Sequence, residues 1–127
     1  MIPKFRCFDK DTKTMHEVVA IDFKDWRVYY EAYGLRNYWN KNVVLMQSTG
    51  LHDKQGVEIF QGDVVKIVYD GEPFIGVVVY DLGEADFKAT NNREDYGNNF
   101  QYLTVGESIE VIGDIHKNPE LLEVVDG

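Results

Sequence analysis

The 127-residue chain contains a single cysteine and lacks any apolar run long enough to cross a membrane as a helix. A membrane-spanning helix needs about 18 or more consecutive apolar residues. One cysteine, Cys7, excludes an internal disulfide and a cysteine-based zinc site, which agrees with a reducing compartment. The first residues also lack the apolar core and cleavage site of a secretory signal. We therefore expect a cytoplasmic protein that does not bind a membrane.

Basic residues are scarce in the second half of the chain. Residues 1–61 carry nine Lys or Arg and eight Asp or Glu, whereas residues 62–127 carry four and fourteen, so the net charges of +1 and −10 account for the total of −9. Phosphate binding needs clustered Lys and Arg. The second half is therefore unsuited to nucleic acid, and acidic residues there serve solubility and keep sheet edges from pairing with neighbours.

Ala and Leu, which favour helices, are sparse outside the last ten residues, whereas Val, Ile and aromatic residues are plentiful. Short polar turns join the apolar segments, and parallel crossovers would need a dozen or more residues. Asp70-Gly71 predicts a hairpin turn, and Gly76 in the following strand predicts a bulge or a bend. Asn118 and Pro119 predict a short C-terminal helical turn. The fold class is all-β, mainly antiparallel.

The side chains that could carry chemistry do not converge in the sequence. The three histidines fall in different expected elements, with none of the spacings of metal motifs: His16, His52 and His116. Cys7 follows a strand pattern and is interpreted as a small buried hydrophobe. No nucleophile elbow or phosphate-binding loop is present. We predict no catalytic residue, no metal site and no cofactor.

The densest acidic group is Asp81, Glu84 and Asp86, around Gly83. Carboxylates of this kind hold divalent ions through oxygen ligands or serve in hydrolysis. A polar turn after a strand needs acidic residues for solubility alone. The spacing matches no calcium loop. An enzyme that uses these carboxylates and a divalent ion is therefore the third expected function, after the protein-binding and nucleic-acid-binding functions given below.

Seven of the seventeen aromatic residues fall within residues 23–39, interleaved with Lys and Arg. This pattern fits three uses: packing in the core, a protein interface with Tyr, Trp and Arg anchors, or a stacking platform for single-stranded nucleic acid. If two adjacent tyrosines lie in one strand, they face opposite sides of it. The candidate binding residues are Lys24, Trp26, Arg27, Tyr29, Tyr30, Tyr33, Tyr38 and Trp39.

Three segments carry a resemblance to a known family: residues 2–6, the stretch 46–65 with its Asp53-Lys54-Gln55-Gly56 and Gly62-Asp63 turns, and residues 110–122. Together they resemble the YopX family of bacteriophage and prophage proteins. The resemblance implies a phage-derived protein in a bacterial cytoplasm, and an SH3-like barrel in the second part. We expect an N-terminal β-meander over 1–50 and the barrel with a C-terminal tail over 51–127.

The resemblance implies no established activity, so it transfers no catalytic residue. The expected function is a non-catalytic phage accessory protein that binds a phage or host protein and forms a small homo-oligomer. The alternative is a nucleic-acid-binding module that uses the nearly neutral first half. Absence of any converging reactive side chains, beside a surplus of interface-type aromatics, favours the protein-binding prediction.

Overall fold

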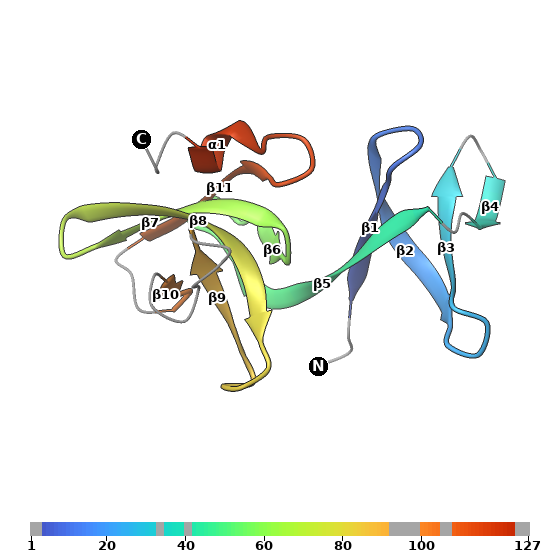
Figure 1. The fold of residues 1–127 in the computed structure, drawn as a ribbon, viewed down its shortest axis with the longest axis horizontal. Helices are drawn as coiled ribbons and strands as arrows, with labels where there is room; N and C mark the ends of the chain where they lie inside the picture. The colour runs from blue at the N-terminus through green and yellow to red at the C-terminus, as the bar shows by residue number, and fades with distance from the viewer. Residues whose placement is uncertain (1–3, 33–34, 40–41, 92–99, 105–107, 124–127) are drawn as a thin grey trace. The chain divides into compact units, whose positions relative to one another are not determined.

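The computed structural model describes residues 4–32, 35–39, 42–91, 100–104 and 108–123 (Figure 1). The described chain is built almost entirely from antiparallel strands, which confirms the predicted all-β class. The strands are β1 (Phe5–Asp9), β2 (Thr14–Asp22), β3 (Arg27–Ala32), β4 (Leu35–Trp39), β5 (Val43–His52), β6 (Glu58–Phe60), β7 (Asp63–Tyr69), β8 (Glu72–Asp81), β9 (Asp86–Thr90), β10 (Phe100–Tyr102) and β11 (Ser108–Asp114). One short helix, α1, spans Glu120–Glu123.

The chain divides into two compact units, Met1–Ser48 and Thr49–Gly127. In the first unit the hydrogen-bonding order of the strands is β4-β3-β2-β1-β5. The second unit begins within β5, to which β6 pairs, and contains a five-stranded sheet of order β10-β9-β8-β7-β11. This order pairs each strand with its neighbour and, in the described part of the chain, does not close β10 onto β11.

Cys7 and Tyr30 form the buried core of the first unit, with Val18, Val28 and Val43 packed around them. Both side chains are fully buried. Burial, and next the negative charge of Asp9, raise the pKa of the Cys7 thiol to about 11. The thiol is therefore protonated at neutral pH, and the interpretation of Cys7 as a small buried hydrophobe is confirmed.

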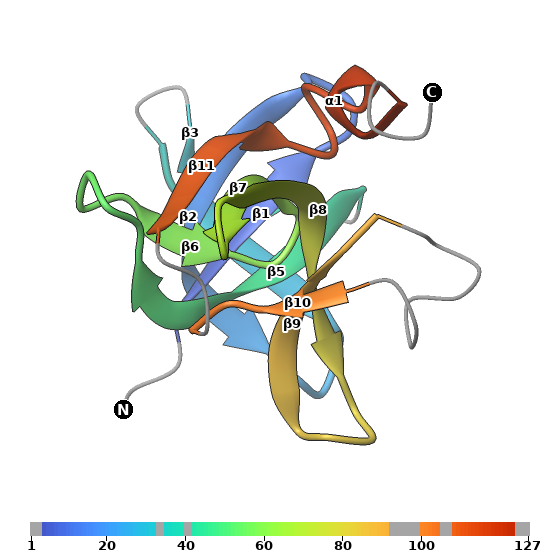
Figure 2. The same cartoon turned by 90° about the vertical axis from the view of Figure 1, so that its left-hand side faces the viewer.

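Apolar side chains cover both faces of the sheet of the second unit. Successive residues of β7 point to opposite faces, and they belong to different apolar clusters. Val65 and Ile67 belong to a cluster with Ile59 and Val78, whereas Val64 belongs to another cluster. The second cluster also contains Val77, and Leu121 of α1 packs against it. Figure 2 shows this unit, with β8 and β9 forming a long hairpin. Burial on both faces explains why β7 reads as a nearly continuous apolar run.

Gly76 lies in regular register with Val65, so no bulge interrupts the β7–β8 pairing at this position. Of the two predicted alternatives, a bulge or a bend, the bulge is therefore wrong. A Cβ atom at position 76 would lie 2.9 Å from the backbone nitrogen of Thr90 in β9. Glycine is required here because another backbone approaches closely. Such an approach is, like a bulge, a common reason for a glycine within a strand.

Three hairpins share one loop design, in which an aspartate ends a strand and four loop residues follow. The three aspartates and the first residues of the return strands are Asp9 and Thr14, Asp22 and Arg27, and Asp81 and Asp86. One carboxylate oxygen of each aspartate accepts hydrogen bonds from the amides two and three residues further along.

The last residue of each of these loops has a positive φ, 58° at Lys13, 56° at Trp26 and 53° at Ala85. Glycine adopts this conformation most easily, and other residues adopt it under strain. Asp70 and Gly71 both have positive φ as well, at 52° and 77°, as a two-residue type I′ turn requires. The predicted Asp70-Gly71 hairpin is thereby confirmed.

Candidate protein-binding surface

The loop between β2 and β3 presents two large aromatic side chains to solvent. Phe23 is 68% exposed and Trp26 is 79% exposed. The loop is nevertheless well defined, because the Asp22 carboxylate accepts hydrogen bonds from the amides of Lys24 at 3.0 Å and Asp25 at 3.2 Å. Exposed aromatics on a fixed turn lose little conformational entropy when a partner binds.

Trp26 occupies the positive-φ position of this loop. The left-handed conformation costs a residue with a Cβ atom about 1–2 kcal/mol. The equivalent positions of the other two loops hold Lys13 and Ala85, so the loop design itself does not demand an aromatic residue. Because burial does not compensate the strain at Trp26, this residue is a candidate for contact with another molecule.

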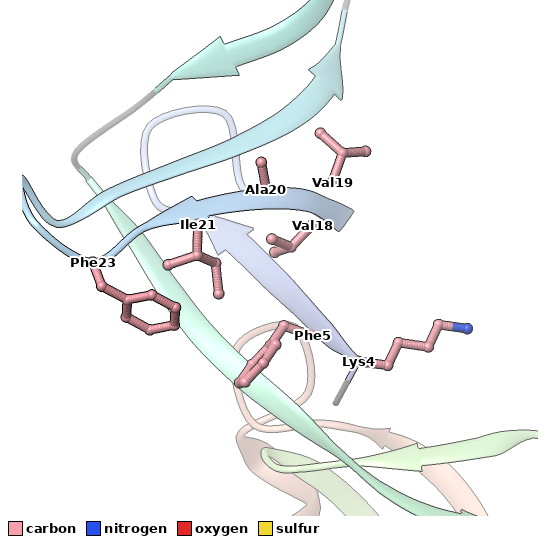
Figure 3. A pocket seen from close by; sticks show the side chains of 7 residues that line it. All are labelled: Lys4, Phe5, Val18, Val19, Ala20, Ile21 and Phe23. Carbon is pink, nitrogen blue, oxygen red and sulfur yellow. The ribbon is translucent and has the colours of Figure 1, made fainter. Parts of the chain in front are cut away.

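A groove of about 350 Å³ lies next to this loop, between the start of β1 and the second half of β2 (Figure 3). Its lining consists of Lys4, Phe5, Val18, Val19, Ala20, Ile21 and Phe23. Figure 3 shows Phe5, Ile21 and Phe23 pointing toward one another, whereas Lys4 points outward from the end of β1. Val19 is 54% exposed. We call the groove together with Trp26 the hairpin surface.

Of the candidate residues predicted from the sequence, Lys24, Trp26 and Arg27 lie at this loop and are exposed. Tyr29 is half-buried. A hydrogen bond with the Tyr29 side chain is the main cause that raises the pKa of Arg27. The structure therefore places these four residues in or beside the hairpin surface.

Tyr30 faces the other way and does not belong to the surface. Its hydroxyl donates a hydrogen bond of 2.5 Å to the buried carboxylate of Asp9. The ring of His16 stacks on the Tyr30 ring at a centroid distance of 4.3 Å. The prediction of Tyr30 as a binding residue is corrected, because a fully buried side chain cannot contact a partner.

The remaining candidates lie on or near β4. Trp39 pairs with Tyr29 across the β3–β4 ladder, and Tyr38 pairs with Tyr30. Tyr33 lies outside the described residues. The sequence prediction omitted the residues that line the groove on β2, because Val18-Val19-Ala20-Ile21 read only as part of an apolar strand.

Two members of the acidic group of the second unit, Asp81 and Glu84, contact the buried Lys88. The Lys88 ammonium lies 2.7 Å from Asp81 Oδ2, 3.2 Å from Glu84 Oε1 and 4.0 Å from the centre of the Phe100 ring. The Tyr102 hydroxyl donates a hydrogen bond of 2.7 Å to Glu84. These contacts tie β10 to the β8–β9 hairpin.

Both carboxylates are held in the ionised form by these partners. The pKa of Asp81 is lowered chiefly by the hydrogen bond from Lys88, and that of Glu84 chiefly by the hydrogen bond from Tyr102. Among the residues that the structure describes, no three His, Cys, Asp or Glu side chains come close enough to hold a metal ion. Through their contacts with the ammonium, Asp81 and Glu84 form a structural clamp around Lys88.

Replacing Lys88 with methionine is expected to lower the melting temperature by about 5 °C or more, because Asp81 and Glu84 would lose the cation between them. Differential scanning calorimetry measures the change. Lys66 is an exposed lysine of β7, and Lys66→Met is the matched control that should melt with the wild type. Equal melting temperatures for the two variants would contradict the clamp.

Comparisons with known proteins agree with this fold. The family model described as YopX protein matches residues 4–123. Protein EF1440 from Enterococcus faecalis is 26% identical, with a TM-score of 0.63 over 96% of this chain and 99% of that one. Protein yopX from Bacillus subtilis is 23% identical, with a TM-score of 0.60 over 93% and 96%. No curated protein matches the chain. Within the described residues, no helix has the length and apolar character needed to cross a membrane.

Proposed function

The chain belongs to the YopX family, and on this premise we propose that it is a non-catalytic module that binds another protein through the hairpin surface. The observation that carries the proposal is Trp26, which is 79% exposed in a strained backbone conformation. Tryptophan is one of the residue types enriched among the residues that dominate binding energy at protein interfaces. The partner is a phage or host protein in the bacterial cytoplasm.

A protein partner suits the surface better than nucleic acid does. Six of the seven residues that line the groove are apolar. In the loop, Lys24 and Arg27 are offset by Asp22 and Asp25, so this segment carries no net charge. Phosphate binding depends on several clustered cations whose counterions are released. Nucleic-acid binding would show itself by an affinity that falls steeply as salt rises.

The second unit is proposed to be an SH3-like barrel that acts as a scaffold. Strands β7, β8, β9 and β11 are antiparallel and contribute side chains to one apolar cluster, which supports this assignment. Its acidic residues are proposed to keep the protein soluble while the hairpin surface remains exposed. A small homo-oligomer is compatible with the same surface.

The Trp26→Gly variant tests the proposal because glycine suits the positive φ at this position. The free energy of unfolding should change by less than about 1 kcal/mol, since relief of strain and the entropy of glycine oppose each other. Binding to a partner should fall by a factor of about 30 or more, as for a residue that dominates an interface. Urea titration measures the first quantity, and quantitative capture of proteins from a bacterial lysate measures the second.

Ala85→Gly is the matched control, since Ala85 occupies the same position of the β8–β9 loop. It should retain every protein that the wild type captures. If Trp26→Gly captures the same proteins in the same amounts as the wild type, or if the wild type captures none, the proposed function is wrong.

A further inference from the structure

The first unit contains a place where two neighbouring strands separate. β1 pairs with β2 from Asp9↔Thr14 as far as Arg6↔Glu17. β2 continues to Asp22 and pairs there with β3. In the described part of the chain, Lys4 and Phe5 take no part in this ladder with β2. The groove of the hairpin surface lies where the two strands diverge.

The groove runs along the edge of β2 instead of over one of its faces. Four consecutive residues of β2, Val18 to Ile21, line it. Successive side chains of a strand point to opposite faces of the sheet. Figure 3 shows Val18 and Ile21 on one side of β2 and Val19 and Ala20 on the other, in agreement with the register shift at this point. Side chains from both sides can line one groove only if it follows the strand edge.

Another strand edge of this protein is closed by its own chain. The amide of Val111 in β11 donates a hydrogen bond to Asp53 at 3.0 Å, and the carbonyl of Ile109 accepts one from Lys54 at 3.0 Å. Polar caps of this kind protect a sheet edge from pairing with other chains. The edge of β2 is flanked instead by apolar side chains, of which Val19 and Phe23 are exposed.

The groove also has a charge preference. Lys4 is the one ionisable residue among the seven that line it. The first unit, residues 1–48, carries eight Lys or Arg and six Asp or Glu, a net charge of +2. A ligand with a carboxylate near Lys4 would therefore be electrostatically complementary to the groove.

We propose that the groove binds an extended segment of another protein, which adds a strand beside β2 and carries apolar side chains and one carboxylate. Main-chain hydrogen bonds supply affinity in such strand addition, and side-chain pockets supply specificity. Phe5, Ile21 and Phe23 form the apolar pocket, and Lys4 attracts the carboxylate. The inference rests on the proposed function, and it names the chemistry of the partner.

Selection from a library of short random peptides displayed on phage particles provides the probe. Peptides retained by the wild-type protein should alternate apolar residues and contain an Asp or Glu. Their affinities are then measured by fluorescence anisotropy with the synthetic peptides. Val19→Glu should weaken binding by about tenfold or more, because it removes apolar contact and repels the carboxylate. Val19 is 54% exposed, so this change should not unfold the core.

A charge exchange tests the role of Lys4. Lys4→Glu should weaken binding of an acidic peptide, and replacement of the acidic residue of that peptide with lysine should restore it. Leu82→Glu introduces the same charge at a residue of the second unit that is 87% exposed, and it should leave binding unchanged. Two N-methylated versions of an enriched peptide test strand addition, each methylated at one of the two alternating sets of amides. Methylation of the set that faces β2 should weaken binding, because those amides can no longer donate hydrogen bonds. Methylation of the other set should leave binding unchanged.

Three results would overturn the inference: no peptide is enriched, Val19→Glu binds the enriched peptides as well as the wild type, or both N-methylated sets bind equally. If Val19→Glu instead converts a wild-type oligomer into a monomer in light scattering while no peptide is enriched, a second copy occupies the groove. These failures leave the proposed function standing as long as Trp26→Gly loses its captured partner. If peptides bind while Trp26→Gly keeps that partner, the groove is a site but the proposed interface is wrong.

Discussion

Replacement of Asp53 with alanine is expected to lower the free energy of unfolding by about 3 kcal/mol, because one buried carboxylate accepts three backbone hydrogen bonds. Oδ1 accepts from the amides of Gln55 and Val57, each at 2.9 Å. Oδ2 accepts from the amide of Val111 at 3.0 Å. The first two bonds fix the turn after β5, and the third joins this turn to β11. Alanine would leave all three amides without this partner.

Urea titration at neutral pH measures the loss for Asp53→Ala. Asp25→Ala is the control, because Asp25 is an exposed aspartate in a loop, and its variant should unfold near the wild-type midpoint. An Asp53→Ala midpoint equal to that of the control would contradict the role of Asp53 as the link between the turn and β11.

The difference in stability between the wild type and Asp53→Ala should change with pH in one direction. The hydrogen bond from the Val111 amide is the main cause that lowers the pKa of Asp53 below its ordinary value of 3.8. The contribution of Asp53 to stability is therefore complete above pH 3.8 and is lost as the pH falls through the lowered folded-state pKa. The difference between wild type and Asp53→Ala should shrink as the pH falls below this value. A difference that grows in acid would contradict the assignment.

Gly76→Ala is expected to lower the free energy of unfolding by about 2–3 kcal/mol, because the new methyl group would overlap a packed backbone. The added Cβ would lie 2.9 Å from the nitrogen and 3.0 Å from the carbonyl carbon of Thr90, and 2.9 Å from the Phe74 ring. Phe74 can rotate, but Thr90 is paired with Val77 in the β8–β9 ladder. Relief would therefore require the two strands to separate.

Chemical unfolding of Gly76→Ala and Gly83→Ala compares a glycine in the sheet with one in a hairpin loop. A Cβ at position 83 would meet only the Asp81 side chain, at 3.2 Å, so this variant should lose less than about 1 kcal/mol. If both variants lose the same small amount, the β8–β9 strands are not held as closely as the structure describes.

The turns were predictable from the sequence because their chemistry is local. In the Asp53-Lys54-Gln55-Gly56 turn, the Gly56 amide donates a hydrogen bond of 3.0 Å to the Asp53 carbonyl, and Gly56 has a φ of 86°. Both features follow from residues within four positions. The bond between Asp53 and Val111 joins residues that are 58 positions apart. No turn rule specifies such a partner, so this contact appears only in the structure.

The candidate site was predictable in part. Tyr29 and Tyr30 were expected to face opposite sides of one strand, but alternation alone does not say which side is the core. Tyr30 is the inner residue because the Asp9 carboxylate accepts its hydroxyl hydrogen there. The groove could not be predicted, because it arises where β1 leaves β2. That separation depends on how three strands pair.

A photo-crosslinking amino acid at position 26 tests most directly whether the hairpin surface binds a protein. 4-Benzoylphenylalanine is incorporated at Trp26 in one variant and at Leu82 in another, both highly exposed positions. After irradiation in bacterial lysate, mass spectrometry measures the adducts. We expect a discrete protein adduct from position 26 that is absent from position 82. No adduct from position 26, or the same adducts from both positions, would contradict it.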